Sequence, residues 1–281
     1  MADDRTSPQP EQEKQPEQTI VLFPELVQLK MEVEKLRTEV SMLLLERDEL
    51  ILVECKNIET AYVLAFGGLE HKAFEWHCRV LRLKRKIELI QAKMNRQEQV
   101  DLSAVEQQLD EEFANFKRQL EDQIHQMNEA LEHSRAPALT PEETTELKHL
   151  YRLIVKQLHP DLHPDITPEQ VKLLQNAITA YENGDLQRLR IISGMLTEPV
   201  APISDENTMV NLKKEKERLI ETIAAIHEKI AAVKESFPYN AKELLSDPKK
   251  MEEHKASLEE LIEDLKEAYD YYTDKWKEMV G

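Results

Sequence analysis

Two histidines and two aspartates alternate with prolines in the run His159-Pro160-Asp161-Leu162-His163-Pro164-Asp165. Imidazole and carboxylate side chains transfer protons in many enzymes and are common metal ligands. His159 and His163 have the spacing that would bring both rings to one face of a helix, but Pro160 and Pro164 prevent a helix here. No cysteine lies nearby to complete a common zinc set. We therefore expect no metal site, and we expect His159 to shape a corner of the chain rather than to act as an acid or base.

An amphipathic helix precedes this run and must end at Pro160. Its apolar residues recur at helical spacing and comprise Leu147, Leu150, Tyr151, Ile154 and Leu158. Beside them lies a basic ridge of three residues spaced four apart, Lys148, Arg152 and Lys156. Thr140 followed by a proline and two glutamates is typical of a helix N-terminus, and a second helical pattern resumes after Pro168. The sequence thus predicts that His159 and Asp161 lie at an exposed corner between two helices.

This stretch resembles a J-domain, the module by which DnaJ-type co-chaperones engage DnaK-type ATPase chaperones. The matching residues are Tyr151-Arg152, the run Leu158 to Pro164, and Ala180-Tyr181-Glu182 in the second helix. The resemblance covers about residues 139–196, a fifth of the chain, and places a J-domain-like module at 137–198. It implies that the basic ridge and His159-Pro160-Asp161 dock on the ATPase and stimulate hydrolysis. The chain departs from the family in lacking a first helix of the Asp-Tyr-Tyr-x-x-Leu-Gly type and in the segment 183–186.

Composition predicts an elongated all-α protein. The chain has 281 residues, only five glycines and 33 % charged residues, and helical stripes cover most of it. Its formal net charge of −18 would repel nucleic acid phosphates and anionic membranes, so we expect neither as a partner. No signal sequence or membrane-length apolar run is visible, which predicts a cytoplasmic protein. Cys55 and Cys78 lie in helical patterns and are expected to be buried thiols rather than a disulfide.

Motifs of common enzymes are missing from the sequence. It contains no Gly-x-Gly-x-x-Gly, no Walker-type Gly-Lys-Ser/Thr and no Gly-x-Ser-x-Gly. Acidic residues are abundant, but they are typical of solvated helix faces, and few loops are available on which to build a pocket. We therefore expect a non-enzyme without a cofactor.

Residues 1–19 are rich in Pro, Gln, Glu and Asp and are expected to be a disordered tail, followed by a long helical hairpin with a third helix at 20–136. Two heptad seams indicate the hairpin: one runs Leu26, Leu29, Val33, Leu36, Val40, Leu43 and Leu50, the other Leu69, Ala73, Trp76, Val80, Leu83, Ile87, Ile90 and Met94. A turn near Gly67-Gly68 would place Glu46 by Lys86. Alternatively, the first seam forms a parallel homo-oligomer, since Lys30 and Arg37 suit a partner's glutamates.

Helical stripes also flank the module on both sides. The predicted third helix, about 101–133, either packs on the hairpin or replaces the missing first helix of the module, and packing is favoured. Proline-bearing stretches at Pro137–Pro141 and Pro199–Pro202 are linkers. Beyond them, two seams joined at Pro238–Pro248 predict a C-terminal helical hairpin over 199–281. Its cluster of Tyr269, Tyr271, Tyr272 and Trp276 is either a binding surface or, as we favour, part of the core.

Two functions are compatible with this organisation, and we favour the first. The first is a J-domain-like co-chaperone that contacts a DnaK-type chaperone through His159, Pro160, Asp161, Lys148, Arg152 and Lys156, while its helical hairpins provide localisation, oligomerisation or client contacts. The second is a helical scaffold or adaptor that has kept a degenerate J-like fold without chaperone activity. The large helical arms and the missing first helix favour the second, and the corner and its basic ridge favour the first.

Overall fold

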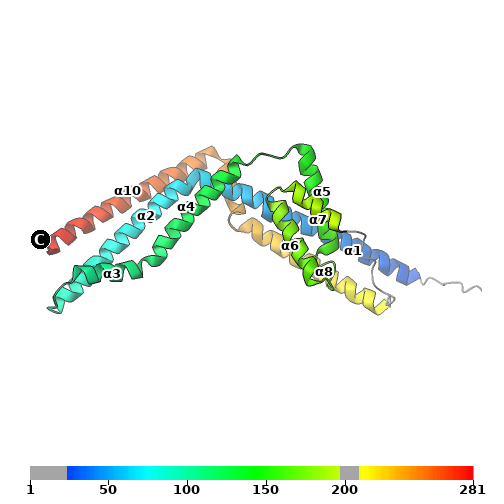
Figure 1. The fold of residues 1–281 in the computed structure, drawn as a ribbon, viewed down its shortest axis with the longest axis horizontal. Helices are drawn as coiled ribbons and strands as arrows, with labels where there is room; N and C mark the ends of the chain where they lie inside the picture. Colours follow the sequence, from blue (N-terminus) through cyan, green and yellow to red (C-terminus); the bar gives the residue numbers. More distant parts are fainter. Residues whose placement is uncertain (1–23, 197–208, 281) are drawn as a thin grey trace, which may run out of the picture.

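A computed structural model describes residues 24–196 and 209–280 of the chain. Regular structure in these ranges is helical and includes no strand, which confirms the all-α prediction. Figure 1 shows an elongated molecule whose helices form two groups that meet at an angle. The predicted disordered tail at 1–19 and the predicted linker at Pro199–Pro202 lie outside the described residues.

One helix of 72 residues spans both groups. It consists of α1 (Pro24–Glu49), a π-helical stretch η1 (Leu50–Cys55) and α2 (Lys56–Asn95). The predicted turn at Gly67-Gly68 is therefore wrong, because α2 continues through both glycines. A glycine inside a helix costs only about 1 kcal/mol relative to alanine, which packing along a helix of this length offsets. The wider turns of η1 rotate the later residues relative to the earlier ones, so the change of phase between the seams needs no chain reversal.

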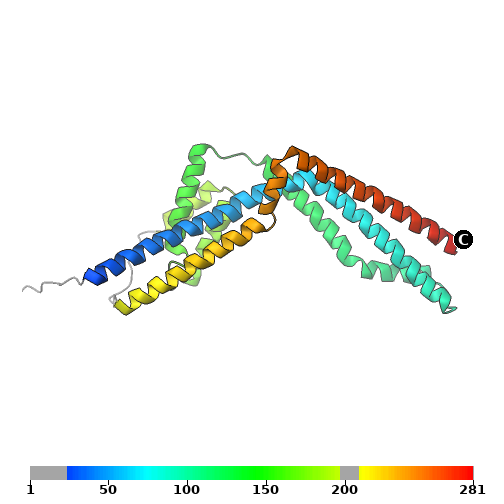
Figure 2. The same cartoon turned by 180° about the vertical axis from the view of Figure 1, so that it is seen from behind.

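The C-terminal half supplies a partner for each section of this helix. Helix α8 (Met209–Glu235) packs along α1, and α10 (Pro248–Val280) packs along α2, as both views of the ribbon show (Figures 1 and 2). Lys216 pairs with Glu32 at 2.8 Å and Lys234 with Glu46 at 3.8 Å, so α8 runs parallel to α1. The predicted C-terminal hairpin is therefore wrong: its two seams pack on α1 and α2 instead of on each other.

The connector between α8 and α10 holds the short helices η2 (Tyr239–Ala241) and α9 (Lys242–Ser246) and passes the junction of α1 with α2. Lys242 pairs with Glu54 at 2.5 Å, which ties the connector to η1. The first seam, on α1, thus has a parallel partner within the same chain, helix α8.

A second pair of helices returns along α2. The predicted third helix is observed as α3 (Leu102–Glu112) and α4 (Ala114–Arg135), with a break at Phe113. Lys86 and Arg82 of α2 bind Glu106 of α3 at 2.5 and 2.7 Å, which explains the basic face of the second seam. The predicted third helix therefore has a packing role, but it packs on α2 rather than on a hairpin.

Aromatic residues of the C-terminal cluster lie mainly at the α2–α10 interface. Tyr269 packs edge-on against Trp76 at 5.7 Å, and Trp276 joins a small cluster around Ile90. Tyr271 stays exposed. The core interpretation therefore holds in part: Tyr269 and Trp276 are half-buried in the interface, Tyr272 is half-buried beside Tyr271, and Tyr271 is exposed.

The molecule divides into two regions, named here for the rest of the text. The inner arm comprises α1, α8 and the three helices α5 (Pro141–Leu158), α6 (Pro168–Glu182) and α7 (Leu186–Met195), which together are called the module. The outer arm comprises α2, α3, α4 and α10. Cys55, at the junction, and Cys78, in the outer arm, are buried free thiols, as predicted.

Candidate functional site: the His-Pro-Asp corner

Local sequence signals determine both helices that flank the corner. Thr140 caps α5 by accepting a hydrogen bond from the backbone N–H of Glu143, whose carboxylate in turn accepts from the N–H of Thr140. Thr167 and Gln170 form the same capping box at α6. Each arrangement satisfies two backbone donors that would otherwise lack partners. The helix boundaries on both sides of the corner therefore follow from short-range chemistry, and α5 ends at Leu158, just before the Pro160 that was predicted to end it.

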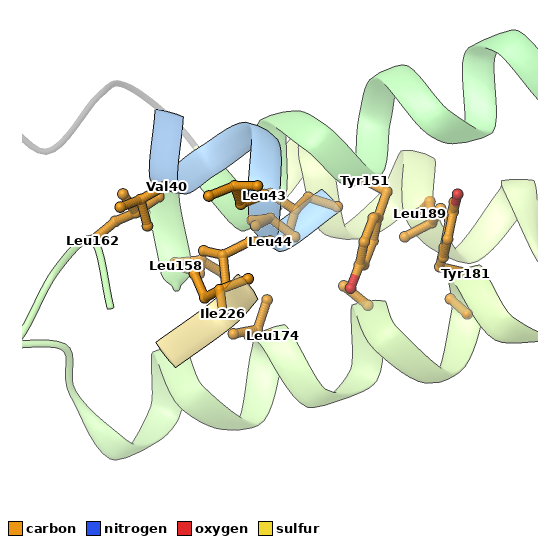
Figure 3. Packing of buried hydrophobic residues seen from close by; sticks show 14 of the residues in the cluster. Val40, Leu43, Leu44, Tyr151, Leu158, Leu162, Leu174, Tyr181, Leu189 and Ile226 are labelled. Carbon is orange, nitrogen blue, oxygen red and sulfur yellow. The ribbon is translucent and has the colours of Figure 1, made fainter. Parts of the chain in front are cut away.

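The core of the module continues into α1 and α8 without interruption. Figure 3 shows Leu158, Leu162 and Leu174 of the module gathered with Val40, Leu43 and Leu44 of α1 and Ile226 of α8. Within the module, the rings of Tyr151 and Tyr181 stack at 4.1 Å. The predicted alternative that residues 101–133 replace the missing first helix is not observed, because α5 packs against α6 and α7 within the module and against α1 outside it.

A buried polar contact joins α5 to α1. The hydroxyl of Tyr151 donates to a carboxylate oxygen of Asp48 at 2.7 Å, and the guanidinium of Arg47 binds the other oxygen of the same carboxylate at 2.5 Å. Burial, together with the negative charge of Asp48, raises the pKa of Tyr151 far above its usual range. The tyrosine therefore stays protonated and remains a donor, so a buried carboxylate is fully partnered where the module meets the arm.

His159 shapes the corner from within. Its side chain is only 12 % exposed, so the prediction that it is presented to solvent is wrong. The ring atom Nδ1 accepts a hydrogen bond from the backbone N–H of Asp161 at 3.1 Å. Burial lowers the pKa of His159 despite the nearby carboxylate of Asp161. A neutral ring is required for this bond, because a protonated Nδ1 carries a hydrogen and cannot accept.

The other residues of the motif are accessible. Pro160 is exposed, and the side chain of Asp161 is 41 % exposed. The backbone N–H groups of Leu162 and His163 both donate to the carbonyl of His159 at 2.9 Å, which closes the turn. Leu162 is buried and anchors the turn in the core. The corner therefore presents a proline and a carboxylate on a backbone that is held by its own hydrogen bonds.

The second His-Pro-Asp, which begins at His163, is an exposed loop, as predicted. The His163 ring contacts the carbonyl of Lys156 at 2.9 Å, so this histidine also braces the end of α5. In the described part of the chain, no three His, Cys, Asp or Glu side chains are grouped so that they could hold a metal ion.

The basic ridge separates into two parts. Lys148 forms an ion pair with Glu49 of α1. Arg152 and Lys156 are exposed, and their charged groups have no partner among the described residues. Two of the three predicted ridge residues thus keep their charges free for another molecule, while Lys148 is already engaged within the protein.

Sequence reasoning missed one participant, Arg218 of α8. Its Nη1 donates to the backbone carbonyl of Asp161 at 2.8 Å, 57 residues away in the chain. Two further hydrogen bonds, both of 2.8 Å, connect the same guanidinium to Glu215, which also pairs with Arg37 of α1 at 3.3 Å. The pair Glu215 and Arg218 is one turn apart beside an apolar seam, a pattern that predicts a helix-surface ion pair and gives no signal for the long-range contact.

Comparisons with known proteins do not assign the chain to a family. No protein-family model, curated protein or solved structure gives a significant match. No helix in the described ranges is both long enough and apolar enough to cross a membrane.

Proposed function

We propose that this protein is a J-domain-like co-chaperone that docks on a DnaK-type chaperone in the cytoplasm and stimulates its ATPase. The observation that carries the proposal is the corner itself: His159 is turned inward to hold the backbone, while Pro160 and the Asp161 carboxylate face outward at the end of a basic helix. A partner would contact a surface whose shape is set before binding, and preorganisation of this kind lowers the entropic cost of association.

Charge also supports docking through α5. Arg152 and Lys156 lie one helical turn apart and expose free positive charges on a protein of net charge −18. Such residues attract an acidic surface, accelerate encounter and orient the partner, and salt screens these effects. The DnaK-type partner is expected to present carboxylates to this face and a cation to Asp161.

The two His-Pro-Asp sequences provide a matched test. Steady-state ATP hydrolysis by a cognate DnaK-type protein is measured with wild type, His159→Gln and His163→Gln. Wild type and His163→Gln are expected to stimulate hydrolysis, whereas His159→Gln is expected to lose stimulation, because only the first motif follows the basic helix and is held by its own histidine. Equal stimulation by all three proteins would remove the corner from the mechanism.

The charge reversals Arg152→Glu and Lys156→Glu, made together, test the docking face. They are expected to weaken binding of the DnaK-type partner and to reduce its salt dependence. Lys148→Glu is expected to have a smaller effect on binding because this lysine is paired with Glu49. Lys172→Glu is a matched control, since Lys172 is an exposed lysine of the same module that lies on α6. Salt-insensitive binding, unchanged in the double variant, would argue against this face.

A helical scaffold without chaperone activity is the second candidate. The continuous core that joins the module to α1 and α8 favours it, because a module built into an arm can serve purely as architecture. Failure of the wild-type protein to stimulate any cognate DnaK-type ATPase, together with failure to bind it, would favour this function.

A further inference from the structure

We infer that Arg218, on the arm helix α8, is a positioning residue for the His-Pro-Asp corner, so that the docking site belongs jointly to the module and the arm. This inference deepens the docking function proposed above and rests on it for its functional meaning. Its structural content can be tested without a partner.

The guanidinium of Arg218 is fixed before it reaches the corner. Glu215 accepts hydrogen bonds from Nε and Nη2 of Arg218, which leaves Nη1 to bind the carbonyl of Asp161. Hydrogen bonding with Arg218 lowers the pKa of Glu215, so this glutamate remains charged at neutral pH. Because Glu215 also pairs with Arg37, the contact continues from α8 into α1. A bidentate arginine–carboxylate pair of this type fixes the orientation of the guanidinium as well as pairing its charge.

Two supports therefore hold the corner from opposite sides. His159 Nδ1 accepts from the Asp161 N–H, and Arg218 donates to the Asp161 carbonyl. Together they satisfy both backbone groups of the same residue, and neither bond uses the Asp161 side chain. The carboxylate thus keeps its 41 % exposure while its backbone is restrained. Loss of either support would let the carboxylate sample more orientations and raise the entropic cost of docking.

Lys216 offers a matched control on the same helix. It forms a 2.8 Å ion pair with Glu32 of α1, so Lys216→Met removes a cation of α8 and a direct contact between α8 and α1. Among the residues that the structure describes, Lys216 makes no hydrogen bond or ion pair with the corner. A change that appears in Arg218→Met and not in Lys216→Met therefore reports the tie to Asp161 and not a general loosening of α8.

Amide hydrogen exchange of the full-length protein measures the tie directly. Exchange at residues 161–163 is expected to be on the order of tenfold faster in Arg218→Met, because a hydrogen bond from a charged donor is lost. Arg218→Lys, which keeps a charge and a donor, is expected to restore part of the protection, and Lys216→Met should match wild type at these amides. Far-UV circular dichroism verifies that all variants stay folded. If the amides of residues 161–163 exchange at the same rate in Arg218→Met as in wild type, the inference is overturned.

Stimulation of a DnaK-type ATPase gives the functional half of the test. If wild type stimulates, Arg218→Met is expected to need about tenfold more protein for half-maximal stimulation, while Lys216→Met behaves as wild type. Stronger stimulation by Arg218→Met would overturn a positioning role, because it would mean that Arg218 restrains the corner from docking. If wild type does not stimulate at all, the proposed function fails, and the exchange measurement still decides whether Arg218 holds the corner.

Discussion

Two parallel helix pairs, α1 with α8 and α2 with α10, are built from the same long helix but are buried differently. In the inner arm, Leu219, Ile226 and Ile230 of α8 are buried in a core that continues into the module. In the outer arm, Ile262 is the buried apolar residue of α10 among those described. Among the described residues, three buried side-chain polar groups without a partner belong to α10 (His254, Thr273 and Trp276), against one in the inner arm, Nε of Arg37.

This difference indicates distinct roles for the arms. Buried polar groups without hydrogen bonds cost free energy, so α10 is held less firmly on α2 than α8 is on α1. The inner arm provides the rigid base that the His-Pro-Asp corner requires. The outer arm extends away from the inner arm (Figure 2), and we propose that it is available for localisation or client contacts.

The largest effect is expected from removing core volume in each arm. Ile226→Ala and Ile262→Ala delete buried side chains that are 2 % and 3 % exposed, and we expect losses of about 3 and about 2 kcal/mol in the free energy of unfolding. The two tryptophans, Trp76 and Trp276, both belong to the outer arm. The urea midpoint monitored by tryptophan fluorescence should therefore fall in Ile262→Ala and hardly change in Ile226→Ala. The loss of stability in Ile226→Ala should appear instead when urea unfolding is monitored by circular dichroism. Coincident shifts of both probes in both variants would mean that the arms unfold as one unit.

Tyr151→Phe should produce the next largest effect. It removes the donor to Asp48 and leaves a buried carboxylate oxygen without that bond, which should destabilise the protein by about 1–3 kcal/mol. Tyr181→Phe is the control, since the Tyr181 ring stacks on the same site but its hydroxyl has no partner among the described residues. Chemical denaturation of both variants checks the expectation, and equal losses would show that the Asp48 contact contributes little.

His159 should make the stability of the inner arm depend on pH. Because burial lowers the pKa of His159 in the folded state, the unfolded state binds a proton more readily. The contribution of His159 to the free energy of unfolding is therefore fully present above its unfolded-state pKa of about 6.5. It is lost as the pH falls through the folded-state pKa. A titration of the His159 ring by NMR is expected to give a pKa below 6.5, and His159→Gln should lessen the acid sensitivity of unfolding. A titration at or above 6.5 would contradict the buried, neutral ring.

Surface charges should give the smallest effect and test the pairing of α1. Glu46→Lys is expected to cost about 0.5 kcal/mol, and adding Lys234→Glu should restore it through the new complementary pair. Adding Lys86→Glu to Glu46→Lys should restore nothing, because Lys86 binds Glu106 instead. Recovery with Lys86 and not with Lys234 would favour the chain reversal at Gly67 that the structure lacks. A double-mutant cycle on the full chain measures both cases.

Short-range signals predicted the corner well. Thr140, the helix end at Leu158 and the loop at His163 follow from capping chemistry and from proline, which act over a few residues. Heptad seams likewise identified which faces of the long helices are apolar. Periodicity does not specify which seam packs on which, however, so two predicted hairpins became two parallel pairs. The inward position of His159 and the hydrogen bond from Arg218 to Asp161 depend on how the helices pair. They could not be predicted without knowing that pairing.

We propose that the corner on the inner arm, and not the outer arm, contacts a DnaK-type chaperone. Hydrogen exchange of the full-length protein, compared with and without an ATP-bound DnaK-type partner, tests it most directly. We predict that binding slows exchange in residues 148–165 while α3, α4 and the distal half of α10 exchange as in the free protein. Protection confined to the outer arm, with an unchanged corner, would contradict the account.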